Sequence, residues 1–520
     1  MSDLISPLAS SLASTLGLGG RKRPTLLLSL ALISGTLARP FASTGGICDI
    51  IDQLEKQLEL ARKDALHRGM IGGMDETPRA WAMWQMGSWK VVFANPDDCK
   101  DILTKHEQFE KMSLDELPVD YFDLFLGRNI VQARTPIWKI HRRIVNPAFR
   151  RTWPTWLFGH PTRFLLSHFD RFAAHGQPID VADWMQRITL DVLSGAAFGS
   201  SLIRLVLAAM VFGRLVPRVR QMYRDIDGFN GHVNGLIDQT MARILAGEVG
   251  QPDGEDESSN LLELMVKAQM KDSEQFSREE LRANIAAFFA AGHDTTANAL
   301  TFTIYLLGMH PDIQQRARNE VIAVMGDLGD RSTDTDSMPF PSNTEQNQLE
   351  YLTCIIKEST RLYPPLISVP PRTLMSPYTF TKSNIHVPAN GSVTASIWAL
   401  HRAKEYWGAD ALKFNPDRWK RANDPASMSD DDGVTEAATP SSVPLHPGAH
   451  GFQWVPFGGG QRLCIGQSFS VIEQRVVMAM LLLRYTWTVV GNEAALAGRP
   501  QSSPGVLLHP VGIMVQMNRR

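Results

Sequence analysis

The chain has 520 residues, 44% of them hydrophobic, and a formal net charge of −2. This hydrophobic content is sufficient for a large core, and the balanced charge gives no basic field for binding nucleic acid. The four cysteines, Cys48, Cys99, Cys354 and Cys464, lie far apart in the sequence. Their spacing argues against a zinc finger or a CxxC redox site and is typical of a reducing compartment.

The N-terminus has two weakly apolar segments, 4–20 and 24–38, on either side of the basic cluster 21–23. If 4–20 anchors the chain in a membrane, the basic cluster places the remaining residues in the cytosol. The second segment is short against the ~20 residues that span a bilayer, and a basic cluster before an apolar run also fits a signal peptide. We favour a membrane anchor or targeting segment over 1–40, with the chain on the cytosolic face of the endoplasmic reticulum, and a linker or the start of the main domain over 41–84.

Residues 89–94 favour a strand, and residues 98–104 favour a short helix. A further helix is expected from Thr135, a good N-cap residue that is followed by proline. Within it, Trp138 and Arg142 are four residues apart and share one face. An indole N–H and a guanidinium are suitable donors to carboxylates, although an arginine over a packed tryptophan is also a common surface arrangement.

A long apolar helix is expected over 281–309, opened by a capping box at 277–280. It contains the stretch 291–296, Ala-Gly-His-Asp-Thr-Thr. A glycine costs about 1 kcal/mol relative to alanine inside a helix, and threonine hydroxyls can bond backbone carbonyls, so we expect a local opening here. Asp294 beside Thr295 is an acid next to an alcohol, which is a route for protons. A polar kink in a core helix is the alternative.

Residues 351–362 favour a helix in which Glu358 and Arg361 share a face and can pair. Prolines force the next segment, 363–372, into an extended conformation. Residues 422–451 are rich in Ser, Pro, Asp and Gly and favour a loose loop.

The most distinctive stretch is 457–466, with the sequence FGGGQRLCIG. Three consecutive glycines allow the loop to pass close to a large flat group. Arg462 supplies a permanent positive charge. Cys464 lies at the start of a helix, where the helix dipole is expected to lower the thiol pKa and to make the thiolate available to a metal. An ordinary buried cysteine beside a glycine-rich turn is the alternative.

This loop resembles the heme-binding loop of the cytochrome P450 family, whose pattern is Phe-x-x-Gly-x-Arg-x-Cys-x-Gly. The fixed positions are all matched, by Phe457, Gly460, Arg462, Cys464 and Gly466. The motifs at 138–142, 294–295 and 358–361 precede it in the order that the family has, and the overall sequence resembles microsomal members from filamentous fungi. The resemblance covers 85–520. It implies one catalytic domain there, mainly α with small β-sheets, with heme b between the long central helix and the cysteine loop.

The resemblance also implies roles for single residues. Cys464 would be the axial thiolate of the heme iron, shielded by Phe457, and Gly466 would let the first turn of the next helix pack tightly. Asp294 would relay protons to dioxygen, to which Thr295 would hydrogen-bond. The heme propionates would be bound by Trp138, Arg142, Arg372 and Arg462. A buried structural triad would consist of Glu358, Arg361 and Arg418. The substrate would contact Phe288, Phe289, Ile367, Ser368 and Val369, although core packing accounts equally well for the two phenylalanines.

The implied reaction is monooxygenation, in which one atom of O₂ enters a lipophilic small molecule of secondary metabolism and the other leaves as water. The sequence shows no dinucleotide fingerprint and no flavin domain, so electrons would come from NADPH through a separate NADPH–cytochrome P450 reductase. Lys139, Arg143 and Arg475 are candidates for docking its acidic surface. The alternatives are a heme-thiolate isomerase or dehydratase acting on a peroxide, and a non-catalytic heme-binding protein. The Asp294–Thr295 pair favours the monooxygenase.

Overall fold

The computed structural model describes residues 59–60, 63, 77–85, 88–112, 126–198, 218–247, 260–271, 273–328, 334–420, 451–503 and 507–520. The expected anchor over 1–40, most of the linker over 41–84, and nearly all of the loop over 422–451 lie outside these ranges. Among the described residues, no helix combines the length and the apolar character needed to cross a bilayer.

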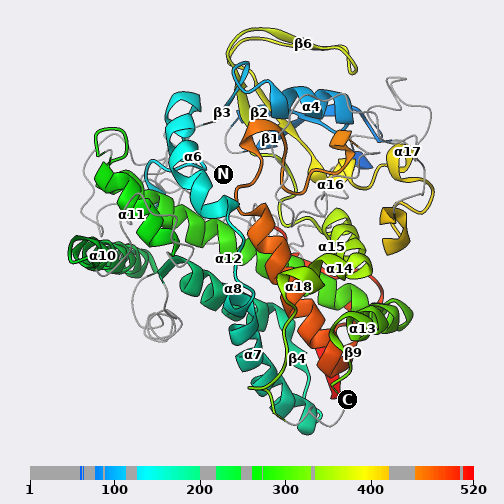
Figure 1. Cartoon of the computed structure of the whole chain (residues 1–520). Coiled ribbons are helices and arrows are strands. Elements are labelled where there is room, and N and C mark those ends of the chain that lie inside the picture. Colours follow the sequence, from blue (N-terminus) through cyan, green and yellow to red (C-terminus); the bar gives the residue numbers. More distant parts are fainter. Residues whose placement is uncertain are drawn as a thin grey trace, which may run out of the picture.

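Helices dominate the structure, and small sheets lie at its edges (Figure 1). The longer helices are α4 (Pro96–Thr104), α6 (Thr135–Arg150), α7 (Trp156–Ala174), α8 (Val181–Phe198), α10 (Arg218–Leu245), α11 (Leu261–Lys271), α12 (Arg278–Met309), α13 (Pro311–Met325), α15 (Glu350–Leu362) and α18 (Gln467–Arg484). The short ones are α14 (Asn343–Gln348), α16 (Ile397–Leu400), α17 (Lys404–Trp407) and α19 (Glu493–Leu496). The mainly α architecture agrees with the sequence-based prediction.

A five-stranded sheet has the strand order β1-β2-β8-β5-β3. Its strands are β1 (Ala80–Gln85), β2 (Ser88–Phe93), β8 (Ser392–Ala395), β5 (Arg372–Leu374) and β3 (Phe109–Lys111). A three-stranded sheet has the order β4-β12-β9, from β4 (Ile179–Asp180), β12 (Met514–Arg519) and β9 (Tyr485–Val490). Two pairs complete the set: β6 (Tyr378–Phe380) with β7 (Ile385–Val387), and β10 (Gln501–Ser503) with β11 (His509–Val511). The domain boundary expected at residue 85 therefore falls inside β1.

The central element is α12, which runs through the middle of the helical part (Figure 1). Ser277 and Glu280 form the expected capping box at its start. The helix is continuous through 291–296, so the local opening expected there is absent. Gly292 has a different explanation. A Cβ at this position would lie 3.1 Å from the side chain of Leu193, so the glycine lets α8 pack closely against α12.

Candidate active site

The cysteine loop is held against α4 by close backbone packing. Gly458 and Gly460 have φ values of 77° and 62°, which only glycine adopts at little cost. A Cβ on Gly460 would lie 2.5 Å from the carbonyl oxygen of Leu103 in α4. The backbone N–H of Cys464 donates to the carbonyl oxygen of Phe457 at 3.0 Å. Glycine is thus required at position 460 for two reasons: the positive φ angle, and the lack of space for a Cβ beside the Leu103 carbonyl oxygen.

Gly466 does not serve the tight packing expected of it. No described protein atom lies within 4 Å of the position that a Cβ would occupy there. The residue is the N-cap of α18, and the space beside it is open.

The thiol of Cys464 has a raised pKa, chiefly because of burial among protein atoms. The backbone N–H of Gly466 and the charges of Arg142 and Lys111 act in the opposite direction but do not outweigh burial. The expected lowering of the Cys464 pKa by the helix start is therefore wrong. Yet the residue is exposed by surface area. The raised pKa reflects the many protein atoms packed around the sulfur, although part of the residue still reaches the surface.

Three cations converge beside this space. Lys111 of β3 is the direct cross-strand partner of Arg372 in β5. The charges of Arg372 and Arg462 repel that of Lys111, and Arg372 also repels Arg462. Burial, with repulsion from the two arginines, lowers the pKa of Lys111 to about 7. Arg372 Nε and Nη1 and Arg462 Nε are buried and have no hydrogen-bond partner among the described residues. Like charges placed opposite each other repel, so this cluster is suited to an anion.

Glu110 is the acid closest to this cluster, and it is already engaged. Its carboxylate accepts from the backbone N–H and the hydroxyl of Thr135, at 2.7 and 2.6 Å, and lies 3.4 Å from Arg462 Nη2. Arg462 also lies over the ring of Trp138, 4.2 Å from its centroid. The remaining positive charge fits a group with two carboxylates, which is what the propionates of heme provide.

Lys111 was not predicted from the sequence. A lysine that ends a short strand carries no signal by itself, because its neighbour Arg372 is brought to it only by the register of β3 and β5. Arg142, which the sequence assigned to a propionate, donates from Nη1 to the carbonyl oxygen of Leu463 at 3.0 Å. Arg142 therefore braces the cysteine loop directly.

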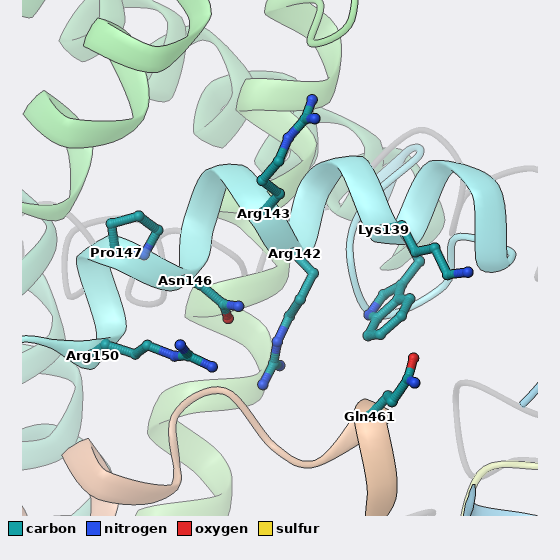
Figure 2. Close-up of a pocket in the computed structure, with 8 residues that line it drawn as sticks. Lys139, Arg142, Arg143, Asn146, Pro147, Arg150 and Gln461 are labelled. Atoms are coloured by element: carbon teal, nitrogen blue, oxygen red, sulfur yellow. The ribbon is translucent and has the colours of Figure 1, made fainter. Parts of the chain in front are cut away.

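The outer face of α6 and the cysteine loop enclose a groove of about 480 Å³. Its lining residues include four cations and no acid: Lys139, Arg142, Arg143 and Arg150. Figure 2 shows Arg142 and Arg150 extending from α6 toward the loop that carries Gln461, whereas Arg143 points to the other side of the helix. Arg475, which was expected beside these residues, is buried and donates to Thr353 Oγ1 at 3.1 Å. Its assignment to a docking surface is wrong.

The motif in α12 lies where the helix changes from buried to accessible. Ala291 is exposed although the helix is buried before it, at Phe288 and Phe289, and after it, from Thr296. The hydroxyl of Thr295 donates to the carbonyl oxygen of Ala291 at 2.8 Å. The accessible side of this turn thus presents a hydroxyl and an alanine methyl group.

The same turn is tied to the cysteine helix. Thr296 Oγ1 and Ser470 Oγ lie 2.9 Å apart, and Gln474 Nε2 donates to Ser470 Oγ at 3.2 Å. Ser470 belongs to the first turn of α18, which follows Cys464 directly. These contacts hold the Asp294–Thr295 motif and the cysteine loop in one rigid frame.

Glu358, Arg361 and Arg418 form one buried network. Arg361 donates twice to Glu358, from Nε and Nη2, both at 2.8 Å, and Arg418 Nε donates at 2.9 Å. Trp419 Nε1 and the backbone N–H of Asn415 also donate to this carboxylate, at 2.9 and 3.0 Å. Both oxygens of Glu358 thus accept hydrogen bonds, which compensates for its complete burial.

His401 links this network to the cysteine loop. Its Nδ1 lies 3.2 Å from the carbonyl oxygen of Arg361, and its Nε2 accepts from the backbone N–H of Val455 at 2.9 Å. Val455 precedes Phe457 by two residues. A displacement of the triad would therefore be transmitted to the loop through one imidazole.

The candidate substrate residues lie in two places. Phe288 packs against Phe149 of α6 and Phe289 against Phe229 of α10, with ring centroids 5.2 and 6.2 Å apart, so both take part in core packing. Val369 is buried against the five-stranded sheet. The other two, Ile367 and Ser368, are half-buried beside it.

Comparisons with known proteins agree with this geometry. The chain matches the family described as "Cytochrome P450" over residues 56–517. It is 28% identical over 467 residues to "Cytochrome P450 734A4" of Oryza sativa subsp. japonica, covering 82% of this chain and 79% of the relative. It is 27% identical to "11-oxo-beta-amyrin 30-oxidase" of Glycyrrhiza uralensis, covering 82% and 80%.

A solved structure, "Zebra fish cytochrome P450 another structure with Abiraterone", aligns with a TM-score of 0.66 and 19% identity, covering 89% of this chain and 98% of that chain. At this identity the alignment supports the fold. The family match spans nearly the whole described structure and includes the cysteine loop, the cation cluster and the α12 motif. The chain therefore belongs to the cytochrome P450 family of monooxygenases, which use heme b as their cofactor.

Proposed function

We propose that this monooxygenase oxidises a lipophilic small molecule of secondary metabolism with electrons from a separate NADPH-dependent reductase. The observation that carries the proposal is the frame in which Thr296 and Ser470 join the Asp294–Thr295 turn to the helix that follows Cys464. A proton-donating motif is useful at a heme thiolate only if dioxygen has to be reduced there. An isomerase or dehydratase that rearranges a peroxide needs no such delivery.

The bound heme supplies the iron at which dioxygen is reduced, and the residues of the chain hold and serve it. Cys464 is the proposed ligand, with Phe457 beside it. The propionates are assigned to Lys111, Arg372 and Arg462, with Trp138 beneath Arg462. The Thr295 hydroxyl is proposed to orient dioxygen by a hydrogen bond, for which it must leave the Ala291 carbonyl. Asp294 is proposed to pass protons to that side of α12.

The substrate class is inferred from the half-buried residues and from one relative. Ile367 and Ser368 precede Arg372 by five and four residues, and they are half-buried, one with an apolar side chain and one with a hydroxyl. The relative named 11-oxo-beta-amyrin 30-oxidase points to polycyclic terpenoids as a first group to test. A lipophilic compound of this kind would also be concentrated by the endoplasmic-reticulum membrane, to which we assign the N-terminal 40 residues.

The electron donor is proposed to bind at the groove between α6 and the cysteine loop. Its four cations, without an acid among the lining residues, suit an acidic partner surface. The loop that contributes Gln461 to the groove also carries Cys464, so a donor bound there would lie close to the residue proposed to hold the cofactor. Charge reversal at Lys139 and Arg150 should slow reduction by the reductase and weaken its salt dependence. An unchanged salt dependence would show that the reductase does not dock at this groove.

The decisive experiment combines purified protein, reductase, NADPH and ¹⁸O₂ with a panel of lipophilic compounds that starts from 11-oxo-β-amyrin. Compounds that shift the heme spectrum toward high spin are selected for product analysis. One labelled oxygen atom in the product, with loss of activity in Cys464→Ala, is the expected result. Product without label would favour an isomerase or dehydratase, and no NADPH-dependent turnover with any binding compound would favour a non-catalytic protein.

A further inference from the structure

His293 of α12 is bonded at both ring nitrogens. Its Nδ1 lies 2.6 Å from the carbonyl oxygen of Phe289, and its Nε2 lies 3.1 Å from Asp294 Oδ1. A carbonyl oxygen can only accept, so Nδ1 carries a proton. Nε2 is then the nitrogen that shares a proton with Asp294. Both side chains are 26% exposed, so the pair is reached by solvent but shielded from most of it.

A second histidine lies near Asp294. Asn298, one turn further along α12, has its amide nitrogen 3.3 Å from Nδ1 of His509 in β11. The charge of His509 also acts on Asp294. Thr189 of α8 donates to the carbonyl oxygen of His293 at 3.1 Å and ties this turn of α12 to α8. The surroundings of the pair thus include a second titratable group, His509, and the polar side chains of Asn298 and Thr189.

Each member of the pair stabilises the charged form of the other. Burial alone would lower the pKa of His293, but the hydrogen bond and charge of Asp294 raise it. Burial alone would raise the pKa of Asp294, but the hydrogen bond and charge of His293, with a contribution from His509, lower it. Both shifts favour the shared proton on the imidazole of His293 over the carboxylate of Asp294.

We propose that His293 holds the proton that Asp294 passes across α12, so that His293, Asp294 and Thr295 form the proton path of this enzyme. His293 acts on dioxygen only through Asp294 and is a positioning residue. The inference rests on the proposed monooxygenase function. In productive turnover, O₂, two electrons from NADPH and two protons convert a substrate C–H bond into C–OH and release water. Without substrate, four electrons and four protons convert O₂ into two waters, whereas two of each release hydrogen peroxide.

The first test measures the titration of His293 in the absence of turnover. Histidines labelled with ¹³C at Cε1 are titrated by NMR in the reduced carbonyl form, which is diamagnetic, and the His293 signal is assigned with His293→Gln. His293 should titrate at a lower pH in Asp294→Asn than in wild type, because the stabilising carboxylate is gone. An identical midpoint in both proteins would overturn the pairing.

The second test measures how efficiently protons are delivered to dioxygen. Reductase-supported NADPH oxidation without added substrate is followed across pH, and the hydrogen peroxide formed per NADPH is measured. We expect about a tenfold larger ratio of peroxide to water in His293→Gln than in wild type. In wild type the ratio should rise as pH increases through the pKa of His293, and this dependence should be absent in the variant.

His310→Gln is the matched control, because His310 also contacts a carbonyl four residues earlier in α12, Leu306 at 2.8 Å, but has no acid beside it. It should behave as wild type. Equal peroxide ratios and pH profiles in the two variants, at equal heme content, would overturn the inference while leaving the monooxygenase function intact. Absence of ¹⁸O from the product of the wild-type enzyme would instead remove the function on which the inference rests.

Discussion

Lys111 lies directly opposite Arg372 in the antiparallel pair of β3 and β5, so two cations face each other at the edge of the cofactor site. Such a pair is unfavourable in isolation and becomes favourable when an anion binds between its members. The cluster is thus arranged for the loaded protein, and part of the folding free energy is available only with heme bound.

Replacing Lys111 with methionine should weaken heme retention. One charge-assisted contact to a propionate is worth about 1.5–3 kcal/mol, which corresponds to about tenfold or more in the rate of heme loss. The measurement is transfer of heme to excess apomyoglobin. Lys139→Met removes an exposed lysine from the groove on α6 and should leave the rate unchanged. Equal rates in both variants would show that Lys111 does not hold the cofactor.

The same lysine should make the stability of the heme-free protein depend on pH. Its pKa is lowered to about 7 in the folded chain, whereas an unfolded lysine keeps its proton up to about pH 10.4. Between these values the unfolded state binds more protons, so the free energy of unfolding should rise with pH, and below about 7 this contribution should stay constant. Urea unfolding of heme-free wild type and Lys111→Met at several pH values measures it. Parallel pH curves would contradict the assignment.

Replacing Glu358 with glutamine should destabilise the fold and the cysteine loop together. The variant leaves Arg361 buried without its carboxylate, at a cost of about 3–5 kcal/mol, and His401 transmits the disturbance to Val455. Heme content and urea unfolding provide the two readouts. Glu350→Gln changes an exposed acid on the same helix and should shift stability by less than about 1 kcal/mol. Wild-type heme content in the Glu358 variant would show that the triad does not stabilise the cysteine loop.

The triad and the cysteine loop could be predicted from the sequence because their signals are local. Glu358 and Arg361 are three residues apart on one helix, so they were expected to pair. Their position before the cysteine loop distinguished them from an ordinary surface pair. The loop itself has a dense pattern of glycines around one arginine and one cysteine. The backbone N–H of Asn415 and the indole of Trp419, which also donate to Glu358, were not predictable, since they reach it only after the chain has folded back.

Other expectations failed because local rules were overridden by surroundings that a sequence does not display. The helix-start rule lowers a cysteine pKa, but desolvation of Cys464 is the larger effect. Arg475 looked like a surface cation, yet α18 is buried on nearly all sides. Gly292 was expected to weaken α12 locally. Instead, the absence of a side chain there allows α8 to pack closely against α12. In each case the deciding neighbour is distant in the sequence.

Two neighbouring glycines allow backbone strain and steric clash to be separated. Gly458→Ala introduces only strain, because φ is 77° and no described atom lies within 4 Å of the new Cβ. Gly460→Ala adds a clash, since its Cβ would meet the Leu103 carbonyl oxygen at 2.5 Å. We expect about 1–2 kcal/mol of destabilisation for the first and a larger loss, with low heme content, for the second. Urea unfolding and the reduced carbonyl spectrum provide the comparison, and equal losses would mean that the loop shifts away from α4 freely.

A buried ion pair far from the cofactor should set the acid limit of stability. Asp170 of α7 accepts from Arg484 Nε at 2.9 Å and from the hydroxyl of Tyr485 at 2.6 Å. Burial would raise the pKa of Asp170, but these hydrogen bonds and the charge of Arg484 lower it below its ordinary value. The stabilisation is therefore fully present above the ordinary pKa of an aspartate, about 3.9, and is lost as pH falls through the lower folded-state pKa.

Asp170→Asn should consequently be destabilised near neutral pH by about 3–5 kcal/mol, because Arg484 is buried, and the difference from wild type should shrink as the solution becomes strongly acidic. The control is Asp183→Asn, whose partner Arg187 lies on the same exposed helix face, with side chains 54% and 43% exposed. An exposed pair of this kind contributes at most about 1 kcal/mol. Unfolding free energies from urea titrations at neutral and acid pH give both differences. A gap between wild type and Asp170→Asn that is the same at all pH values would mean that packing, and not the charge of Asp170, stabilises this end of the molecule.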